Sequence, residues 1–317
     1  MDAPLIIALP SKGRLKEQVE AWLADCALKL EADGGARGYS GRLKGLDGAQ
    51  VRLLSAGDIA EALDAGEVHL GVTGEDLMRE RPGDLAARAL LLRPLGFGRA
   101  DLVVATPKSW LDVATMADLE EVAHDILART GRRMRVATKY ILQTRAFFAR
   151  HGLVDYRIVE SGGATEGAPA AGAAELVVDI TTTGATLEAN GLKVLDDGVI
   201  LKSQAQLAAS LRATWTSPQM AAAESLLRQV EARASARRSA TLTWPEVAGA
   251  EAVIDDLVAL GASRRPNGLL VAADGVAEAG RALSRAGLGP VTAAQPDFVF
   301  ETASPGWAQL QAALQDN

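Results

Sequence analysis

Residues 175–192 read ELVVDITTTGATLEANGL, and they give the most direct indication of the fold class. Val177 and Val178 suit a buried strand, and Asp179 follows them at its carboxyl end. A turn rich in threonine and glycine comes next, and a short helix then ends at Gly191. A strand, a turn and a helix in this order form the repeating unit of an α/β protein.

The turn after this strand has two interpretations. It consists of Thr181, Thr182, Thr183, Gly184, Ala185 and Thr186. Amides at a helix start and threonine hydroxyls can surround a phosphate, and Gly184 lets the backbone approach the ligand closely. Asp179 could then accept hydrogen bonds from ribose hydroxyls. The same residue types also cap helices that bind nothing, so the composition of the turn alone leaves both interpretations open.

The composition describes an ordinary globular chain. Its 317 residues are 48% hydrophobic and 23% charged, which is enough for two or three domains with their own cores. A formal charge of −7 and only 4% aromatic residues argue against a nucleic-acid-binding protein. The apolar run 5–9 is too short for a signal peptide or a membrane span, so we expect a cytoplasmic protein. Cys26 lies among apolar residues at helical spacing and is expected in the core.

The order of apolar and amphipathic runs predicts a mainly parallel sheet in the first half of the chain. Strands are expected at 5–9, 51–54, 68–72, 101–105, 135–137 and 156–159. The chain could cross between two lobes at 94–98 and again around Thr182. Ligands of such sheets collect at the carboxyl ends of strands, so one shared cleft is predicted. From Trp215 onward, helices at 218–234, 248–260 and 277–286 and strands at 240–244, 269–272 and 298–300 predict a small α+β domain.

Four further segments carry candidate site residues. In PSKGRL, residues 10–15, Lys12 and Arg14 suit an anionic substrate or a solvated helix start. In GVTGEDL, residues 71–77, Thr73 and Asp76 could cap a helix that begins near Gly74. If Glu75 or Asp76 faces the cleft instead, it could orient ribose hydroxyls or hold water on Mg2+. The other two candidates are Arg99, at a possible hinge, and Glu166, which either caps a short helix or meets a ribose.

Six segments resemble, in the same order, the ATP phosphoribosyltransferase family, which catalyses the first step of histidine biosynthesis. They are LIIALPSKGRL at 5–15, VHLGVTGEDL at 68–77, LGFGRADLVVATP at 95–107, RVATKYILQTRAFFARHG at 135–152, EGAP at 166–169 and VDITTTGATLEANGL at 178–192. The resemblance implies an α/β fold with two lobes like those of periplasmic binding proteins. One lobe would hold residues 1–95 and 180–215 and the other residues 96–179. Residues 216–317 would form a smaller α+β domain for regulation or assembly, which is ferredoxin-like and binds histidine in longer members of the family.

The resemblance also implies a reaction. N1 of ATP would attack C1 of phosphoribosyl pyrophosphate and release pyrophosphate, with Mg2+ on the pyrophosphate, in a homodimer or hexamer. Lys12 and Arg14 would be the catalytic cations, Asp179 would bind the ribose, and residues 182–186 would hold the 5′-phosphate. Further substrate contacts are expected from Thr73, Gly74, Glu75, Asp76, Arg99 and Glu166.

Two departures from the family pattern stand out. Residues 202–205 read KSQA where many long members read RSKA, and the tail shows the α/β alternation of the regulatory domain without its motifs. Histidine feedback is therefore left open. The alternatives to the enzyme are a two-lobed solute-binding protein and a non-catalytic regulatory homologue. The absence of an export signal disfavours the first, and the complete set of Lys12, Arg14, Asp179 and the turn disfavours the second.

Overall fold

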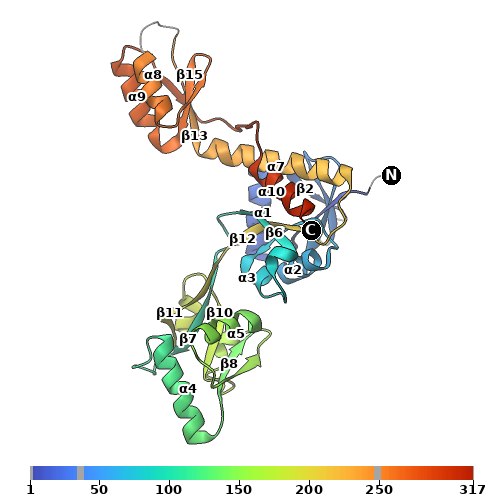
Figure 1. The fold of residues 1–317 in the computed structure, drawn as a ribbon, viewed down its shortest axis with the longest axis vertical. Coiled ribbons are helices and arrows are strands. Elements are labelled where there is room, and N and C mark those ends of the chain that lie inside the picture. Colours follow the sequence, from blue (N-terminus) through green and yellow to red (C-terminus); the bar gives the residue numbers. More distant parts are fainter. Residues whose placement is uncertain (1–2, 34–38, 246–250, 317) are drawn as a thin grey trace.

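The computed structural model describes residues 3–33, 39–245 and 251–316. Figure 1 shows three bodies in a row, which we call lobe I, lobe II and the small domain, with lobe I in the middle. Each body is built around its own sheet, of seven, five and four strands respectively. Within the described ranges, every helix is too short or too polar to cross a lipid bilayer.

Lobe I contains a seven-stranded mixed sheet in the order β2-β3-β4-β1-β5-β12-β6. The strands are β1 (Leu5–Pro10), β2 (Lys29–Ala32), β3 (Ser40–Lys44), β4 (Ala49–Leu54), β5 (Leu70–Gly74), β6 (Ala89–Pro94) and β12 (Ala205–Ser210). Strand β1 pairs in parallel with β4 and β5, whereas β12 runs antiparallel between β5 and β6. Helix α1 (Gly13–Asp25) covers one face and α2 (Ala56–Ala65) the other. Cys26 is buried in the core under α1, as the sequence predicted.

Lobe II contains a five-stranded sheet in the order β11-β7-β10-β8-β9. The strands are β7 (Ala100–Pro107), β8 (Met134–Thr138), β9 (Tyr156–Glu160), β10 (Leu176–Thr181) and β11 (Leu192–Ser203). Its helices are α4 (Met116–Thr130), α5 (Ile141–Arg150) and the short α6 (Ala185–Ala189). The parallel strands β9, β8 and β10 end at one edge of the sheet. The six strands expected for the first half of the chain are all present.

The boundary between the lobes differs from the one the resemblance implied. Strand β11 pairs with β7 from Leu192↔Pro107 to Ser203↔Ala100, and Leu187 of α6 packs in the same core, so residues 180–203 belong to lobe II. Only the segment from β12 onward returns to lobe I. The physical reason is that β7 and β11 form one long antiparallel ribbon, and both of its strands continue into lobe I side by side. The second crossing therefore lies at Gln204 rather than around Thr182.

The two crossings are hydrogen-bonded to each other. Leu95 N donates to Ala205 O at 2.9 Å, and Ala205 N donates to Phe97 O at 3.0 Å. The side chain of Gln204 adds a third bond, because its Oε1 accepts from Gly96 N at 3.0 Å. Gly96, with φ +77°, has a backbone conformation that favours glycine. A lysine at position 204 has no acceptor, so the departure from the RSKA pattern gives this chain a bond between its two crossings.

The small domain follows the long helix α7 (Ser217–Arg237), which leads away from lobe I (Figure 1). Its antiparallel sheet has the order β14-β15-β13-β16. The elements are β13 (Ser239–Thr243), α8 (Glu251–Ala259), β14 (Ser263–Arg265), β15 (Gly268–Ala272), α9 (Val276–Arg285) and β16 (Thr292–Ala294). The expected start of the second helix, at 248, lies outside the described residues. The expected strand at 298–300 is absent, because Val299 N donates instead to Ala232 O of α7.

The ends of the expected C-terminal domain belong structurally to lobe I. The chain returns from the small domain and finishes in α10 (Pro305–Gln315). Leu226 and Leu227 of α7 and Trp307 and Leu310 of α10 are buried in the same core as α1. The separate body is therefore shorter than 216–317 and carries its own core, with Leu242, Leu269 and Leu283 at its centre.

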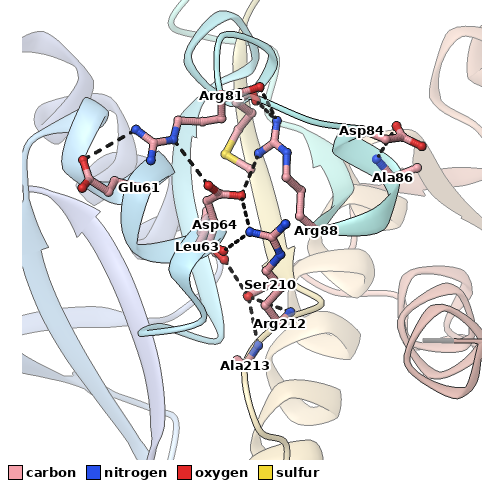
Figure 2. A network of polar contacts seen from close by, with 11 residues as sticks. Glu61, Leu63, Asp64, Arg81, Asp84, Ala86, Arg88, Ser210, Arg212 and Ala213 are labelled. Atoms are coloured by element: carbon pink, nitrogen blue, oxygen red, sulfur yellow. Dashed lines mark hydrogen bonds and ion pairs between the residues drawn. The ribbon is translucent and has the colours of Figure 1, made fainter.

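A network of charged side chains lies in lobe I beside α2 (Figure 2). Asp64, 8% exposed, accepts from Arg88 Nη1 at 3.3 Å and from Arg212 Nη1 at 3.2 Å, and Arg81 lies 3.6 Å away. Arg88 is only 1% exposed, and its Nη2 also donates to Met78 O at 2.7 Å. These contacts join α2 to the start of β6 and the end of β12. Asp64 is therefore the counter-charge of a buried cation.

Candidate active site

The carboxyl end of β10 carries the first group of candidate residues. Asp179 is half-buried, and its Oδ1 accepts from Ile180 N at 2.8 Å. Burial raises the pKa of the Asp179 carboxyl, the Ile180 hydrogen bond and Lys139 oppose that rise, and the Glu166 carboxylate adds to it. These electrostatic interactions place Lys139 and Glu166 close to Asp179. Two carboxylates and one cation thus interact electrostatically in lobe II, near the end of β10.

The turn that follows is held by its own threonines. Gly184 N donates to Thr181 Oγ1 at 2.8 Å, and Ala185 N donates to Thr183 Oγ1 at 3.4 Å. Gly184 has φ +78°, and a Cβ added there would meet no atom within 4 Å. Thr186 and the other residues at 182, 183 and 185 are exposed. The turn therefore has a fixed backbone and an open side, which is the shape a phosphate requires.

The first crossing lies against this turn. Thr182 Oγ1 donates to Arg99 O at 3.1 Å, which brings the exposed Arg99 beside the expected phosphate site. A Cβ added to Gly98 would lie 3.0 Å from Leu15 Cδ1 and 3.2 Å from Ala205 Cβ. The start of α1, the crossing and the turn therefore follow one another around the junction of the lobes.

Lys12 and Arg14 lie at this start of α1. Lys12 is the extended residue before the helix, with φ −157°, and Gly13 follows with φ +74°. Both cationic side chains are exposed. Neither has a hydrogen-bond or ion-pair partner among the residues that the structure describes. Both cations are therefore available to a ligand at the start of α1.

The residues from Thr73 to Glu75 have their polar groups engaged within lobe I. Thr73 is fully buried, and its hydroxyl donates to Ala56 O at 2.6 Å, so the predicted capping by Thr73 is wrong. Helix α3 (Glu75–Arg79) begins after Gly74, and a Cβ on Gly74 would collide with Asp76 Oδ1. Glu75 pairs with Arg79 at 2.7 Å and accepts from Gln206 Nε2 at 2.9 Å.

Asp76 forms a contact between the lobes instead of facing the cleft. Its Oδ2 accepts from Tyr140 Oη at 2.6 Å and its Oδ1 from Ser203 Oγ at 2.8 Å. Asp76 is 4% exposed and Tyr140 1% exposed. Burial, and then the neighbouring Asp76 carboxylate, raise the pKa of the Tyr140 phenol. The phenol therefore stays protonated and donates across the junction.

Glu80 adds a second contact between the lobes. Its carboxylate accepts from Leu142 N at 2.7 Å and from Gln143 N at 3.2 Å, at the first turn of α5. These amides lack partners inside their own helix, and a negative charge is favourable at that end. A residue of lobe I thus caps a helix of lobe II. Such a partner, far away in the sequence, is invisible to local pattern analysis.

Glu166 and Lys139 are the two charged residues near Asp179. Glu166 lies in a short 3-10 helix, Thr165–Gly167, which has no side-chain cap, so its expected capping role is wrong. Lys139 was missed in the sequence, although it directly follows strand β8. Its Nζ lies 4.9 Å from the centre of the Tyr140 ring. The position just after a parallel strand was the signal that could have found it.

The described residues contain no group of three or more histidine, cysteine, aspartate or glutamate side chains that could hold a metal ion. Asp179, Glu166 and Lys139 interact electrostatically in lobe II, and the exposed cations Lys12 and Arg14 lie at the start of α1 in lobe I. These features define a two-lobed α/β protein with a candidate anion site at the junction of its lobes.

Comparison with known proteins identifies the family. The family model described as HisG, ATP phosphoribosyltransferase, matches residues 55–232. The chain is 66% identical over 317 residues to an ATP phosphoribosyltransferase of Caulobacter vibrioides, covering 99% of both chains. It is 59% identical over 232 residues to that of Bradyrhizobium sp. (strain ORS 278), covering 73% of this chain and 71% of the relative. The chain therefore belongs to the ATP phosphoribosyltransferase family, and is a pentosyltransferase of the first step of histidine biosynthesis.

A solved structure supports the fold assignment. The ATP phosphoribosyl transferase (HisG:HisZ) complex from Thermotoga maritima superposes with a TM-score of 0.55 at 23% identity. The match covers 72% of this chain and 96% of that chain. At this identity the similarity concerns the two-lobed fold alone.

Proposed function

We propose that the transfer to N1 of ATP takes place where the β10 end and its turn face the start of α1. The observation that carries this proposal is the open side of Gly184, in a turn held by Thr181 and Thr183 directly after Asp179. Residues 182–186 would hold the 5′-phosphate, and Asp179 would accept hydrogen bonds from the ribose. Arg99 and Glu166 lie beside these groups and are proposed as further substrate contacts.

The transfer reaction requires that the two substrates are positioned and that the charge developing on the leaving group is neutralised. The bond from C1 to the pyrophosphate breaks as N1 of ATP approaches, so positive charge develops on the ribosyl group and negative charge on the leaving group. Lys12 and Arg14, which have no partner among the described residues, would neutralise that leaving group. Lys139 would be a third cation at the same edge. No nucleophilic side chain is needed.

Magnesium is proposed to enter on the pyrophosphate. Mg2+ usually keeps several waters and takes one or two carboxylates together with substrate phosphates. Asp179 and Glu166 fit that need, because the two carboxylates repel each other, as the effect of Glu166 on the pKa of Asp179 indicates. When bound, the ion would supply charge neutralisation to the phosphates.

Titration calorimetry tests the ribose role. Phosphoribosyl pyrophosphate with Mg2+ is titrated into the wild type, Asp179→Asn and Asp112→Asn. Asp112 is an exposed aspartate of lobe II and is the matched control. We expect weaker binding of the ribosyl substrate only in Asp179→Asn, with ATP affinity unchanged. If Asp179→Asn weakened the binding of phosphoribosyl pyrophosphate and of ATP equally, the proposed contact between Asp179 and the ribose would be refuted.

The remaining proposals concern the tail, assembly and location. The small domain has its own core, and all residues proposed for catalysis precede Trp215, so we propose a regulatory or assembly role for it. In a regulatory role, histidine would inhibit without competing with ATP, as coupling between distinct sites requires. If calorimetry detects no histidine binding to the intact chain, the proposed role in histidine regulation is refuted and only the assembly role remains. We further propose a homodimer or hexamer in the cytoplasm.

A further inference from the structure

A cavity of about 540 Å³ lies away from the proposed catalytic cleft. Its walls come from the edge strand β6, from α7 and from the returning segment 299–306. Pockets for small metabolites typically have volumes of roughly 300 to 1,000 Å³. The cavity is thus large enough for a compact molecule, and it is formed where lobe I, the connecting helix and the returning tail meet.

A bulge in β6 places Arg93 in this cavity. Leu207 pairs with Arg93 and the next residue, Ala208, pairs with Leu91, so Leu92 is an extra residue in the strand. Leu207 faces the core under α1 and α7, whereas Ala208 faces the core under α2. Because side chains alternate along a strand, a regular β6 would point Arg93 toward α2. The bulge turns the guanidinium toward α7, and bulges commonly re-aim a side chain in this way.

The side chains of Arg93 and Arg238 form no ion pair among the described residues. Burial, and then the positive charge of Arg238, lower the pKa of Arg93, while the Glu231 carboxylate opposes part of that fall. Among the described residues, neither guanidinium has a hydrogen-bond or ion-pair partner. The nearby carboxylate of Glu231 is already engaged, since it accepts from Ser304 Oγ at 2.5 Å and from Gly306 N at 2.7 Å. A partly buried cation beside a second cation is unfavourable until an anion joins them.

The rest of the cavity supplies an apolar wall. Leu92, Ala232 and Val299 line it, and the last two are 2% and 9% exposed. Guanidinium groups bind carboxylate and phosphate oxygens in matched pairs of hydrogen bonds. We propose that this cavity binds a small metabolite that carries one carboxylate or phosphate, with the acidic group between Arg93 and Arg238 and a compact body against the apolar wall.

Equilibrium dialysis of the full chain with labelled inorganic phosphate and, separately, labelled propanoate tests this site. The two probes distinguish a phosphate ligand from a carboxylate ligand. The variants are Arg93→Gln, Arg238→Gln and the control Arg281→Gln, an exposed arginine of α9. Gly184→Val in the catalytic turn separates the two sites. Arg238 is exposed, so its variant carries the test even if Arg93→Gln folds poorly.

We expect at least one probe to bind about tenfold or more weakly to Arg93→Gln and Arg238→Gln, because each removes a charge-assisted hydrogen bond. Arg281→Gln and Gly184→Val should retain this binding. The site is refuted if the wild type binds neither probe, or if both arginine variants bind as Arg281→Gln does. Loss confined to Gly184→Val would place the anion in the catalytic turn and refute the site as well.

Discussion

Replacing Gly184 with valine separates a phosphate-binding turn from a turn that only begins a helix. Gly184 has φ +78° and ψ −10°, a left-handed conformation that a β-branched residue adopts poorly. An added Cβ meets no atom within 4 Å, so the substitution brings backbone strain but no clash inside the protein. Strain of this kind costs about 1 to 3 kcal/mol. We therefore expect a modest loss of stability and a folded protein.

The effect on the substrate should be much larger. The valine side chain would project from the open side of the turn, where the 5′-phosphate must approach the backbone. Hydrogen bonds to a charged group contribute about 1.5 to 3 kcal/mol each, so losing two of them weakens binding by about 100-fold or more. The expected signature is a collapse of affinity for phosphoribosyl pyrophosphate in a protein that still melts cooperatively.

Gly131→Val is the matched control for this experiment. Gly131 ends α4 in the same lobe with φ +68°, and a Cβ there also meets nothing within 4 Å. Both variants should lose similar stability in a thermal melt, and calorimetry on the same samples should show lost affinity in Gly184→Val alone. Equal affinity of the two variants for the substrate would refute the assignment of the turn.

Three further outcomes are expected. Lys12→Ala or Arg14→Ala should lower turnover by about 100-fold or more without a change in melting temperature, because preorganised charge at a developing anion contributes roughly 3 to 4 kcal/mol; normal turnover in both would make them surface cations. Asp64→Ala should lower the free energy of unfolding in a denaturant titration by about 3 to 5 kcal/mol, because Arg88 is left buried without its counter-charge; a loss below about 1 kcal/mol would contradict that role. Asp179→Asn should be at least as stable as the wild type near neutral pH. The raised pKa of Asp179 means that its contribution to stability is complete below the unfolded pKa and is lost as pH rises through the folded one, so a less stable variant at neutral pH would contradict this sign.

Part of the candidate site could be predicted from the sequence because it depends on residues that are neighbours in the chain. Strand β10 and the turn at Gly184 follow from an apolar run and a glycine that needs positive φ, although β10 continues past Asp179 to Thr181. The first crossing was also predictable, because Gly96 and Gly98 interrupt the pattern between two strands. These features depend on neighbours in the sequence, and such dependence is what pattern analysis detects.

Long-range pairing set the limit of prediction. An apolar strand carries no label for its sheet, so the pairing of β11 with β7 could not be read from residues 192–203. The burial of Asp76 depends on Tyr140, which is 64 residues away in the sequence. Thr73 likewise has the residue type of a cap, but its hydroxyl is used by a distant carbonyl group. In each case a partner far along the chain determines the role of a locally ambiguous residue.

Turnover by the full chain tests the central claim most directly. The protein is mixed with fresh ATP, phosphoribosyl pyrophosphate and Mg2+, with pyrophosphatase present and with histidine and AMP absent, and phosphoribosyl-ATP is followed by its absorbance. We expect product that depends on both substrates and disappears when a chelator removes the magnesium. No product from folded protein under these conditions would contradict the catalytic role of the cleft.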